Sequence, residues 1–281
     1  MHRSSSGPTA DSYAPVRPHA FTKAAPPAKA DKRDMVLVPT FADEFDGPAG
    51  TPPDPKRWTY DLGGDGWGNN QLEYNTNRVE NVALDGKGCL AITARRETYK
   101  GNAYTSARIK TEGLFTTQFG RVEARIKLPP GQGIWPAFWM LGDNAAQAGW
   151  PGCGEIDIME YRGQFPRDAL GTIHGPGYSG AGGISKTLTL GEGGFDKDFH
   201  LFTVDWEPGK IVFSIDGMPY HTLTSEAVTP LGPWVFDDHP FFIILNVAVG
   251  GGFVGNPDAT TPFPATMLVD YVRVFEKRPK P

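Results

Sequence analysis

Strand-length apolar segments recur along this chain from Met35 onward, and Gly, Pro, Asn or Asp closes each of them. RVEARIKLP (121–129) shows the pattern most clearly, because every second residue from Val122 to Leu128 is apolar and the residues between them are charged. Such alternation predicts a half-buried antiparallel strand with one charged face. The further segments of this kind are CLAITARR (89–96), GIWPAFWML (133–141), GEIDIMEY (154–161), LFTVDWEPGKIVFSIDG (201–217), FFIILNVAV (241–249) and TMLVDYVRVFE (266–276).

The composition agrees with many strands joined by turns. The chain has 35 Gly and 26 Pro among 281 residues, and it lacks long stretches of helix-favouring residues. EPGK and IDGMPY, both within or next to the segment 201–217, have the residues of tight turns. All-β units of this length are common, and 39% hydrophobic residues suffice for a substantial core. We therefore predict an all-β fold, a jelly-roll β-sandwich of two antiparallel sheets packed face to face.

The domain organisation follows from a change in composition near residue 35. Residues 1–34 are rich in Pro, Ser, Ala and charge, so we expect a disordered leader there. The folded domain is expected at 35–277, with a short tail at 278–281. The chain contains neither an apolar run near the roughly 18 residues of a membrane span nor the apolar core of a signal peptide.

Charge and cysteine content exclude some functions and leave others open. A net charge of −5 without a basic stripe argues against a nucleic-acid or anionic-membrane partner. Cys89 and Cys153 could form one disulfide, but two small buried side chains are the favoured interpretation. GPGYSG (175–180) fits a nucleotide-binding glycine pattern only formally, because no strand-then-helix context surrounds it.

Three acids fall on one predicted strand, in PGCGEIDIMEYRG (151–163). Alternation places Glu155 and Asp157 on one face, but it would point Glu160 into the apolar layer. An ionised carboxylate there is very costly. One extra residue, inserted as a β-bulge near Ile158–Met159, shifts the alternation and returns Glu160 to the face of the other two. The unequal spacing therefore predicts a bulge.

Three carboxyl groups on one face suggest glycosidase chemistry. The backbones of Glu155 and Glu160 would be ~13 Å apart at ~3.3 Å per residue, and their long side chains can lean together with Asp157 between them. Retaining glycosidases need two carboxyl groups about 5–5.5 Å apart. Crowding drives their pKa values apart, so that one keeps a proton near neutral pH. The spacing alone leaves a calcium site or a solvated polar face open.

Tryptophans near the acid strand favour a sugar ligand, because sugar rings stack their C–H faces on aromatic side chains. Trp135, Trp139 and Trp150 come just before the acids, and Trp67 lies in GGDGWGNNQLEYNT. Trp135 and Trp139 would share one face of a strand, with Ala137 leaving a gap between them. The tryptophans for which we instead expect core packing are Trp58 and Trp206.

GWPGCGEIDIMEYRG resembles the active-site signature of glycoside hydrolase family 16, in the bulged E-x-D-x-x-E form of bacterial laminarinases. Several distant blocks agree with this resemblance, which covers residues 36–276. These blocks are FADEFDG (41–47), GWGNNQLEYNT (66–76), YTSARIKTEGLFTTQFGRVEARIKLPPGQGIWPAFWML (104–141), TIHGP (172–176), DWEPGKIVFSIDG (205–217), LNVAVGG (245–251) and MLVDYVRVF (267–275).

The resemblance implies a jelly roll with an open cleft across its concave sheet and hydrolysis of internal β-1,3 linkages with retention. It implies that Glu155 is the nucleophile, that Glu160 is the acid/base, and that Asp157 hydrogen-bonds the nucleophile. His174 matches a family histidine that can contact the sugar or Glu160, although a lone histidine is otherwise more often structural. The positions that match subsite residues are Asn69, Arg108, Trp135, Trp139 and Trp150.

Two blocks depart from the family pattern. Gln71 and Glu73 stand in the opposite order to the Glu and Gln common in laminarinases, and Gly252 and Phe253 replace a common Asn and Trp. We expect both changes to affect sugar contacts at the edge of the cleft, and therefore linkage preference.

Several laminarinases also hold a structural calcium ion on the convex face. The matching positions here are Glu44, the backbone of Gly88, and Asp270. The hard oxygen ligands favour calcium over a transition metal. The alternative is that Glu44 and Asp270 are ordinary surface acids.

The resemblance thus implies a secreted, monomeric endo-β-1,3-glucanase that binds β-glucan and requires no cofactor for its chemistry. A relative acting on mixed-linkage glucan or on a galactan is the alternative enzyme. The bulged spacing disfavours the first, and the GWGN and GEIDIMEY blocks disfavour the second. A non-catalytic β-glucan-binding protein is the alternative from another class, but such proteins typically lose the carboxyls that this chain keeps.

Overall fold

The computed structural model describes residues 35–277, with the side chains of 35–40 and 277 left out. The expected leader at 1–34 and tail at 278–281 lie outside the described residues. Within 35–277 the chain forms 17 strands and three short helices. The strands are β1 (Met35–Asp43), β2 (Thr59–Asp61), β3 (Glu73–Asn75), β4 (Val82–Leu84), β5 (Leu90–Tyr99), β6 (Asn102–Ser106), β7 (Arg108–Lys110), β8 (Gly120–Lys127), β9 (Ile134–Gly142), β10 (Glu155–Tyr161), β11 (Asp168–His174), β12 (Ile184–Thr189), β13 (His200–Glu207), β14 (Lys210–Ile215), β15 (Met218–Thr224), β16 (Phe241–Val249) and β17 (Ala265–Lys277). The helices are α1 (Ala145–Ala148), η2 (Gly180–Gly182) and α2 (Ser225–Val228).

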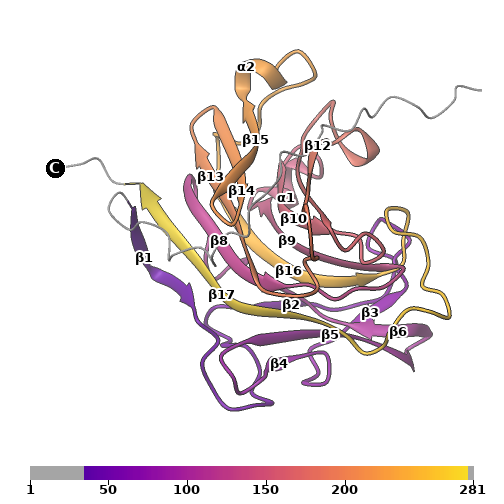
Figure 1. The fold of residues 1–281 in the computed structure, drawn as a ribbon. Coiled ribbons are helices and arrows are strands. Elements are labelled where there is room, and N and C mark those ends of the chain that lie inside the picture. Colours follow the sequence, from indigo (N-terminus) through magenta and orange to yellow (C-terminus); the bar gives the residue numbers. More distant parts are fainter. Residues whose placement is uncertain (1–34, 278–281) are drawn as a thin grey trace, which may run out of the picture.

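The strands form two sheets that lie one against the other (Figure 1). The ten-stranded sheet has the order β15-β14-β13-β8-β17-β5-β6-β3, with β1 beside β17 and β4 beside β5. The seven-stranded sheet has the order β12-β11-β10-β9-β16-β7-β2. The strand pairs are antiparallel except for β3 with β6. The predicted all-β sandwich is therefore confirmed, with one parallel pair that the sequence did not suggest.

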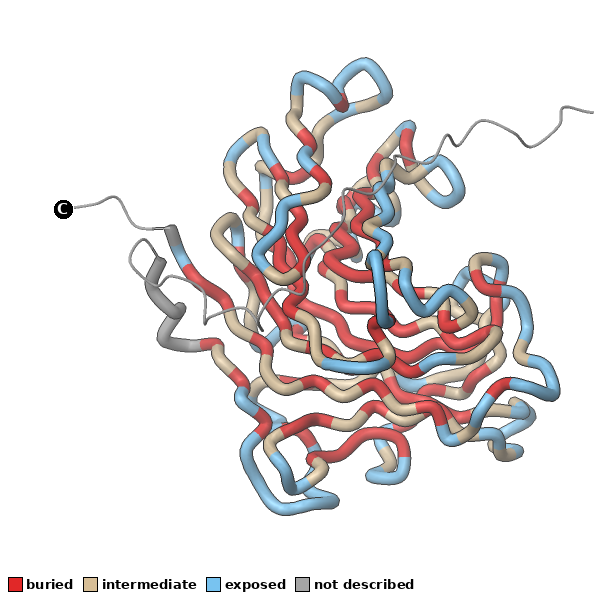
Figure 2. Tube along the Cα trace, viewed as in Figure 1, coloured by how far each residue is buried: buried red, intermediate tan, exposed pale blue. Residues whose placement is uncertain are grey.

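The core lies between the two sheets, where the buried stretches of neighbouring strands run side by side (Figure 2). Val122 and Ile126 of the large sheet are fully buried, as are Phe138, Ile156 and Leu245 of the small sheet. Each of the expected strand segments contains a strand in the structure, and 201–217 contains two. Alternation works here because each sheet has one face against the other sheet.

The two expected turns are also present. Glu207 pairs with Lys210 across EPGK, which makes β13 and β14 a hairpin. Ile215 pairs with Met218 across the next turn, where Asp216 and Gly217 have φ of 51° and 77°. Positive φ at both central residues is the type I′ geometry that fits the twist of a hairpin.

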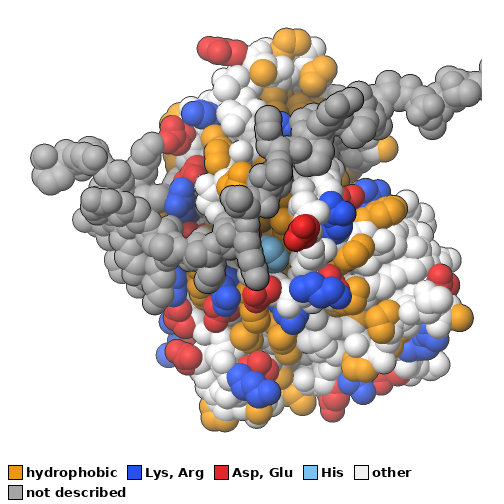
Figure 3. Space-filling view, in the orientation of Figure 1, with side chains coloured by type: hydrophobic (Ala, Val, Ile, Leu, Met, Phe, Trp, Pro, Cys, Tyr) orange, Lys and Arg blue, Asp and Glu red, His pale blue; other side chains and the backbone are white. Residues whose placement is uncertain are grey.

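The outer face of β8 carries the expected charges, and neighbouring strands pair its two arginines. Arg121 donates to both carboxylate oxygens of Asp205 at 2.8 and 2.7 Å, and Arg125 donates to Asp270 at 2.7 Å. Glu123, between the two arginines, is only 2% exposed. Elsewhere on the surface, Lys and Arg side chains are interspersed with Asp and Glu, as the face in Figure 3 shows. Within residues 35–277, no helix is both long and apolar enough to cross a membrane.

Candidate active site

Strand β10 contains the predicted bulge. Asp157 pairs with Trp139 on β9, but the next pair is Met159 with Phe138, so Ile158 is the extra residue. The pairing with β11 shifts between Asp157 and Glu160 as well. The bulge falls where the spacing of the acids predicted it.

The bulge places the apolar and acidic side chains of β10 on opposite faces. The four apolar side chains, Ile156, Ile158, Met159 and Tyr161, belong to the buried core. The carboxyl groups of the three acids contact groups on the other face of the sheet, which we call the acid face. Glu160 is thus outside the apolar layer, as the bulge requires.

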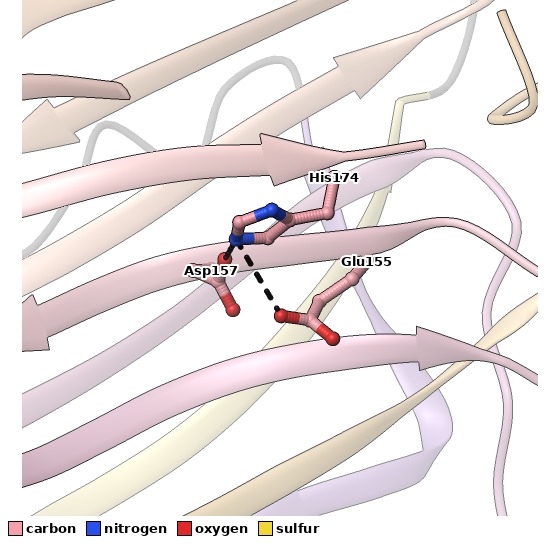
Figure 4. Close-up of side chains that lie close together, drawn as sticks. All are labelled: Glu155, Asp157 and His174. Atoms are coloured by element: carbon pink, nitrogen blue, oxygen red, sulfur yellow. Dashed lines mark ion pairs between the residues drawn. The ribbon is translucent and has the colours of Figure 1, made fainter. Parts of the chain in front are cut away.

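Glu155 and Asp157 form a compact cluster with His174, which ends β11 (Figure 4). The imidazole Nε2 lies 3.2 Å from Asp157 Oδ2 and 3.7 Å from Glu155 Oε1. A hydrogen bond also joins the carboxyl groups of Glu155 and Asp157. The other oxygen of Glu155, Oε2, accepts the indole N–H of Trp150 at 2.9 Å. His174 therefore contacts Glu155 and Asp157 rather than Glu160, the carboxyl group that the resemblance implied as its partner.

Glu160 has a separate set of donors. Its Oε1 accepts the indole N–H of Trp135 at 3.1 Å, and its Oε2 accepts the hydroxyl of Thr172 at 3.4 Å. Thr172 is 2% exposed and shares a 2.8 Å hydrogen bond with the hydroxyl of Ser185 on β12. These contacts hold the carboxyl group toward β9 and β11, the two neighbours of its own strand.

Burial raises the pKa of all three carboxyl groups. The pKa of Glu155 rises to about 8 because of burial and the neighbouring charge of Asp157. The pKa of Glu160 rises to about 7, chiefly through burial, while the nearby His174 lowers it. Burial and the charge of Glu160 raise the pKa of Asp157. The three carboxyl groups therefore keep protons near neutral pH, as a general acid requires, and they titrate together. The pKa of Glu155 lies above that of Glu160, the reverse of the order that an ionised nucleophile beside a protonated acid needs, so the two roles rest on the family resemblance and not on these values.

The strands beside β10 build an aromatic and polar floor. Trp139 lies opposite Asp157, and Ala137, opposite Glu160, leaves the expected gap between Trp139 and Trp135. Trp139 donates its indole N–H to the side-chain oxygen of Asn246 on β16 at 2.8 Å. The floor therefore combines flat apolar rings with fixed hydrogen-bonding groups, as a sugar site needs.

Arg108 on β7 continues this floor. Its guanidinium carbon lies 4.7 Å from the ring centre of Trp139 and 5.0 Å from that of Trp67, so the cation lies between two aromatic faces. Its Nε lies 2.8 Å from a carboxylate oxygen of Asp61 on β2. Asp61 also pairs with Lys110 at 2.7 Å. The structure thus brings Arg108 and Trp139 together, and Asp61 holds the guanidinium group in position.

Aromatic groups also lie beside Glu160. The ring centres of Trp135 and Phe253 are 5.0 Å apart. Arg162, just after β10, lies between the rings of Phe253 and Phe165, at 5.1 and 4.7 Å from their centres. The departure at Phe253 therefore lies at the acid face. Trp150 beside Glu155 is 52% exposed, which leaves its ring open to a ligand.

The departure at Gln71 and Glu73 has a different meaning from the one expected. Glu73 is 0% exposed, so the prediction that it belongs to an edge contact with sugar is wrong. Its Oε2 accepts the backbone N–H of Val249 at 2.8 Å, at the end of β16. Gln71 and Asn69 lie on the loop before β3, and Asn69 is exposed, with its backbone oxygen bonded to the N–H of Gly252.

The two acids expected to bind calcium make other contacts. Glu44 accepts two N–H groups of Arg273 at 2.7 and 2.6 Å, and Asp270 pairs with Arg125. With both carboxylates facing arginines, the donor set fits a calcium ion poorly as it stands. Within 35–277, the group of three or more His, Cys, Asp and Glu ligand atoms that converges is that of Glu155, Asp157 and His174. The calcium site on the convex face stays a prediction.

The interpretations of the remaining tryptophans and cysteines are confirmed. Trp58 and Trp206 are each 1% exposed within the core. Cys89 and Cys153 are buried and unpaired.

Three residues that hold the site were not predicted from the sequence. Thr172 could have been found, because it precedes His174 by two positions and therefore shares its face of β11. Asn246 lies in the LNVAVGG block, but the apolar residues around it do not indicate which side chain it would bond. Asp61 could not be connected with Arg108, since the pair depends on strands that are far apart in sequence.

Comparison with known proteins agrees with this geometry. Residues 67–273 match the model of the family described as glycosyl hydrolases family 16. The beta-glucanase of Rhodothermus marinus is 42% identical over 245 residues, which cover 84% of each chain. The glucan endo-1,3-beta-glucosidase of Cryptopygus antarcticus is 41% identical over 229 residues, which cover 76% of this chain and 81% of that protein.

A solved structure gives the same result for the fold. The X-ray structure of the endo-beta-1,3-glucanase from Pyrococcus furiosus superposes with a TM-score of 0.83 at 47% identity. The superposition covers 92% of this chain and 100% of the other. The jelly-roll sandwich expected from the sequence is therefore confirmed, and the family match includes every member of the acid cluster.

Proposed function

The chain belongs to glycosyl hydrolase family 16, and from its acid face we propose that it is an endo-acting glycoside hydrolase that cleaves internal β-1,3-glucosidic bonds with retention. The observation that carries this proposal is the bulge at Ile158. It places Glu155, Asp157 and Glu160 on one face, with separate donors on the two glutamates. The β-glucan class follows from the relatives, which are β-glucanases and endo-1,3-β-glucanases.

The reaction uses the two glutamates in two steps. In the first, ionised Glu155 attacks the anomeric carbon while protonated Glu160 gives its proton to the departing glycosidic oxygen. This produces a glycosyl ester on Glu155 and releases one part of the glucan. In the second, Glu160 takes a proton from water, the oxygen of that water attacks the anomeric carbon, and Glu155 leaves as a carboxylate. Two inversions restore the original configuration.

The crowding of the cluster suits the change in the role of Glu160. Esterification removes the negative charge of Glu155, and that charge is one cause of the raised pKa of Glu160. Its loss lowers the pKa of Glu160, so the group that was the acid becomes the base. Asp157 and His174 hold Glu155 in place and spread the charge that returns to it.

The floor of the acid face supplies the substrate contacts in this proposal. The rings of Trp135, Trp139 and Trp150 stack on the apolar faces of glucose units. Arg108 and Asn69 bond the sugar hydroxyls, with Arg108 held in a fixed orientation by Asp61. Endo action requires that the polymer extend past both ends of the cluster.

The Glu155→Gln variant tests the assignment of the nucleophile. It should bind laminarin oligosaccharides with affinity similar to that of the parent chain but release no reducing sugar from laminarin. Glu80→Gln at an exposed position is the control and should cut normally. Persistent hydrolysis by Glu155→Gln would refute the assignment, and β-configured products seen first by NMR would support retention.

A substrate panel tests the linkage. Reducing-sugar release should be greatest on laminarin and smaller on barley glucan and lichenan. Agarose and carrageenan should remain uncut. Preference for a galactan would overturn the substrate assignment, and binding to laminarin without any release would indicate a non-catalytic glucan-binding protein.

We also propose that the protein is secreted, because a polymeric glucan is met outside the cell, and that it acts as a monomer. Double displacement between two carboxyl groups needs no cofactor. A calcium ion at Glu44 and Asp270 would be structural, and it would have to displace Arg273 and Arg125 from these carboxylates.

A further inference from the structure

The cluster of Glu155, Asp157 and His174 has the composition of a transition-metal site. Each residue offers one ligand atom, and the three atoms lie within 4.8 Å of one another. One imidazole nitrogen and two carboxylate oxygens form a ligand set of the kind used by zinc. Imidazole suits late first-row transition metals, whereas calcium and magnesium prefer oxygen alone.

The distances fit such an ion. Zinc bonds of about 2.0–2.2 Å in a tetrahedral arrangement separate neighbouring ligands by about 3.3–3.6 Å. The imidazole Nε2 of His174 is 3.2 Å from Asp157 Oδ2 and 3.7 Å from Glu155 Oε1, on either side of that range. The third pair, between the two carboxylates, lies within the same 4.8 Å.

An unsatisfied buried oxygen points to a ligand independently of the composition. Asp157 is 3% exposed, and its Oδ2 accepts no hydrogen bond although the imidazole nitrogen is near. A buried carboxylate oxygen without a donor is destabilising, and a cation can satisfy it. His174 Nδ1 is also without a partner, so no contact on that side fixes the imidazole as a proton donor toward Asp157.

The cluster can accept an ion and keep its contact with Trp150, whereas the hydrogen bond between the carboxyl groups of Glu155 and Asp157 is given up because the ion displaces its proton. Trp150 bonds Oε2 of Glu155, whereas the oxygen nearest to His174 is Oε1. The side chains of His174 and Glu155 are 12% and 17% exposed, so the site is confined but reachable. A water molecule could take the fourth position on the open side.

We propose that Glu155, Asp157 and His174 bind a divalent late first-row transition-metal ion, with Zn²⁺ the best fit, and that this ion inhibits the enzyme reversibly. Inhibition rests on the proposed function, because a metal bond to Glu155 Oε1 occupies the nucleophile. Binding itself does not rest on it. The ion and the glucan compete for the same carboxylate.

Calorimetric titration of the full chain with ZnCl₂, without glucan, tests the binding. The parent chain should bind one Zn²⁺. His174→Ala should bind none, or its affinity should fall by more than the roughly 10–100-fold loss that is typical when an outer partner of a metal ligand is removed. His200→Gln is the matched control, since His200 forms a 2.7 Å pair with Asp216 outside the cluster. Asp157→Asn provides a second variant, and thermal unfolding checks that each one folds.

The outcomes separate the two claims. Zn²⁺ affinity that is equal in His174→Ala, Asp157→Asn and the parent chain would overturn the site. Binding at the cluster with laminarin hydrolysis unchanged at saturating Zn²⁺ would overturn the inhibition. A chain that binds Zn²⁺ through these residues but never cuts laminarin would support the site and contradict the proposed function.

Discussion

Replacing Glu73 by glutamine should stabilise the protein, and increasingly so as the pH rises. Glu73 is 0% exposed, and burial raises its pKa to about 8. Glutamine has nearly the same volume and no charge, so the core need not repack. Its carbonyl oxygen can keep the hydrogen bond from the N–H of Val249. Its amide can donate to the side-chain oxygen of Asn75, which has no partner, once the Asn75 amide turns over.

The sign and size of the effect follow from the two pKa values. In the unfolded chain the carboxyl group ionises above its ordinary value of 4.5, whereas in the folded chain it stays protonated until about pH 8. Between these values the unfolded state gains stability by about 1.4 kcal/mol per pH unit from this group alone. The cost to folding is absent below pH 4.5, is about 3 kcal/mol at pH 7, and levels off near 5 kcal/mol at pH 8 and above. The Glu73→Gln substitution removes this cost to folding.

Urea unfolding of the parent chain and of Glu73→Gln at pH 5, 6.5 and 8 measures this difference. The gain in the free energy of unfolding should be small at pH 5 and grow by more than about 2 kcal/mol at pH 8. Glu80→Gln, at an exposed position, controls for the loss of one negative charge. A gain of the same size at all three pH values would refute the reasoning, because it would show that Glu73 titrates alike in both states.

Three further outcomes are expected. Trp150→Phe removes a donor that lowers the pKa of Glu155, so the acidic limb of the kcat/KM profile should move to higher pH; an unmoved limb would contradict this. Thr172→Val removes a donor that lowers the pKa of Glu160, so the alkaline limb should move up by as much as about one pH unit, and a downward shift would count against the contact. If calcium binds on the convex face, CaCl₂ should raise the midpoint of thermal unfolding above that in EDTA, and equal midpoints would rule out the site.

Local pattern was sufficient for the strands and for the bulge. Alternation over one strand depends only on which face meets the other sheet, so RVEARIKLP and GEIDIMEY could be placed without knowing their partners. The cost of burying one charged side chain is large enough to predict a backbone irregularity at Ile158 from spacing alone. The face of each acid was therefore predictable.

Long-range packing was not predictable from local pattern. Glu73 looks like a solvated acid in its loop, and only the N–H of Val249, 176 residues further along the chain, shows that its carboxyl group lies inside the molecule. The roles of Glu44 and Asp270 depend in the same way on arginines from other strands. Such contacts arise from strand order, which in this fold joins distant parts of the chain.

The bulge at Ile158 lies opposite a glycine on the neighbouring strand β11. Ile158 and Met159 are consecutive, yet both are buried, so β10 sends two neighbouring side chains into the core where a regular strand would send one. Opposite them on β11 lies Gly171, between the partners of Asp157 and Glu160. A Cβ atom at Gly171 would lie 2.7 Å from the Phe213 ring and 2.6 Å from the hydroxyl of Tyr220. The missing side chain on β11 therefore makes room for Phe213 and Tyr220, which lie close against β11 at the level where β10 bulges.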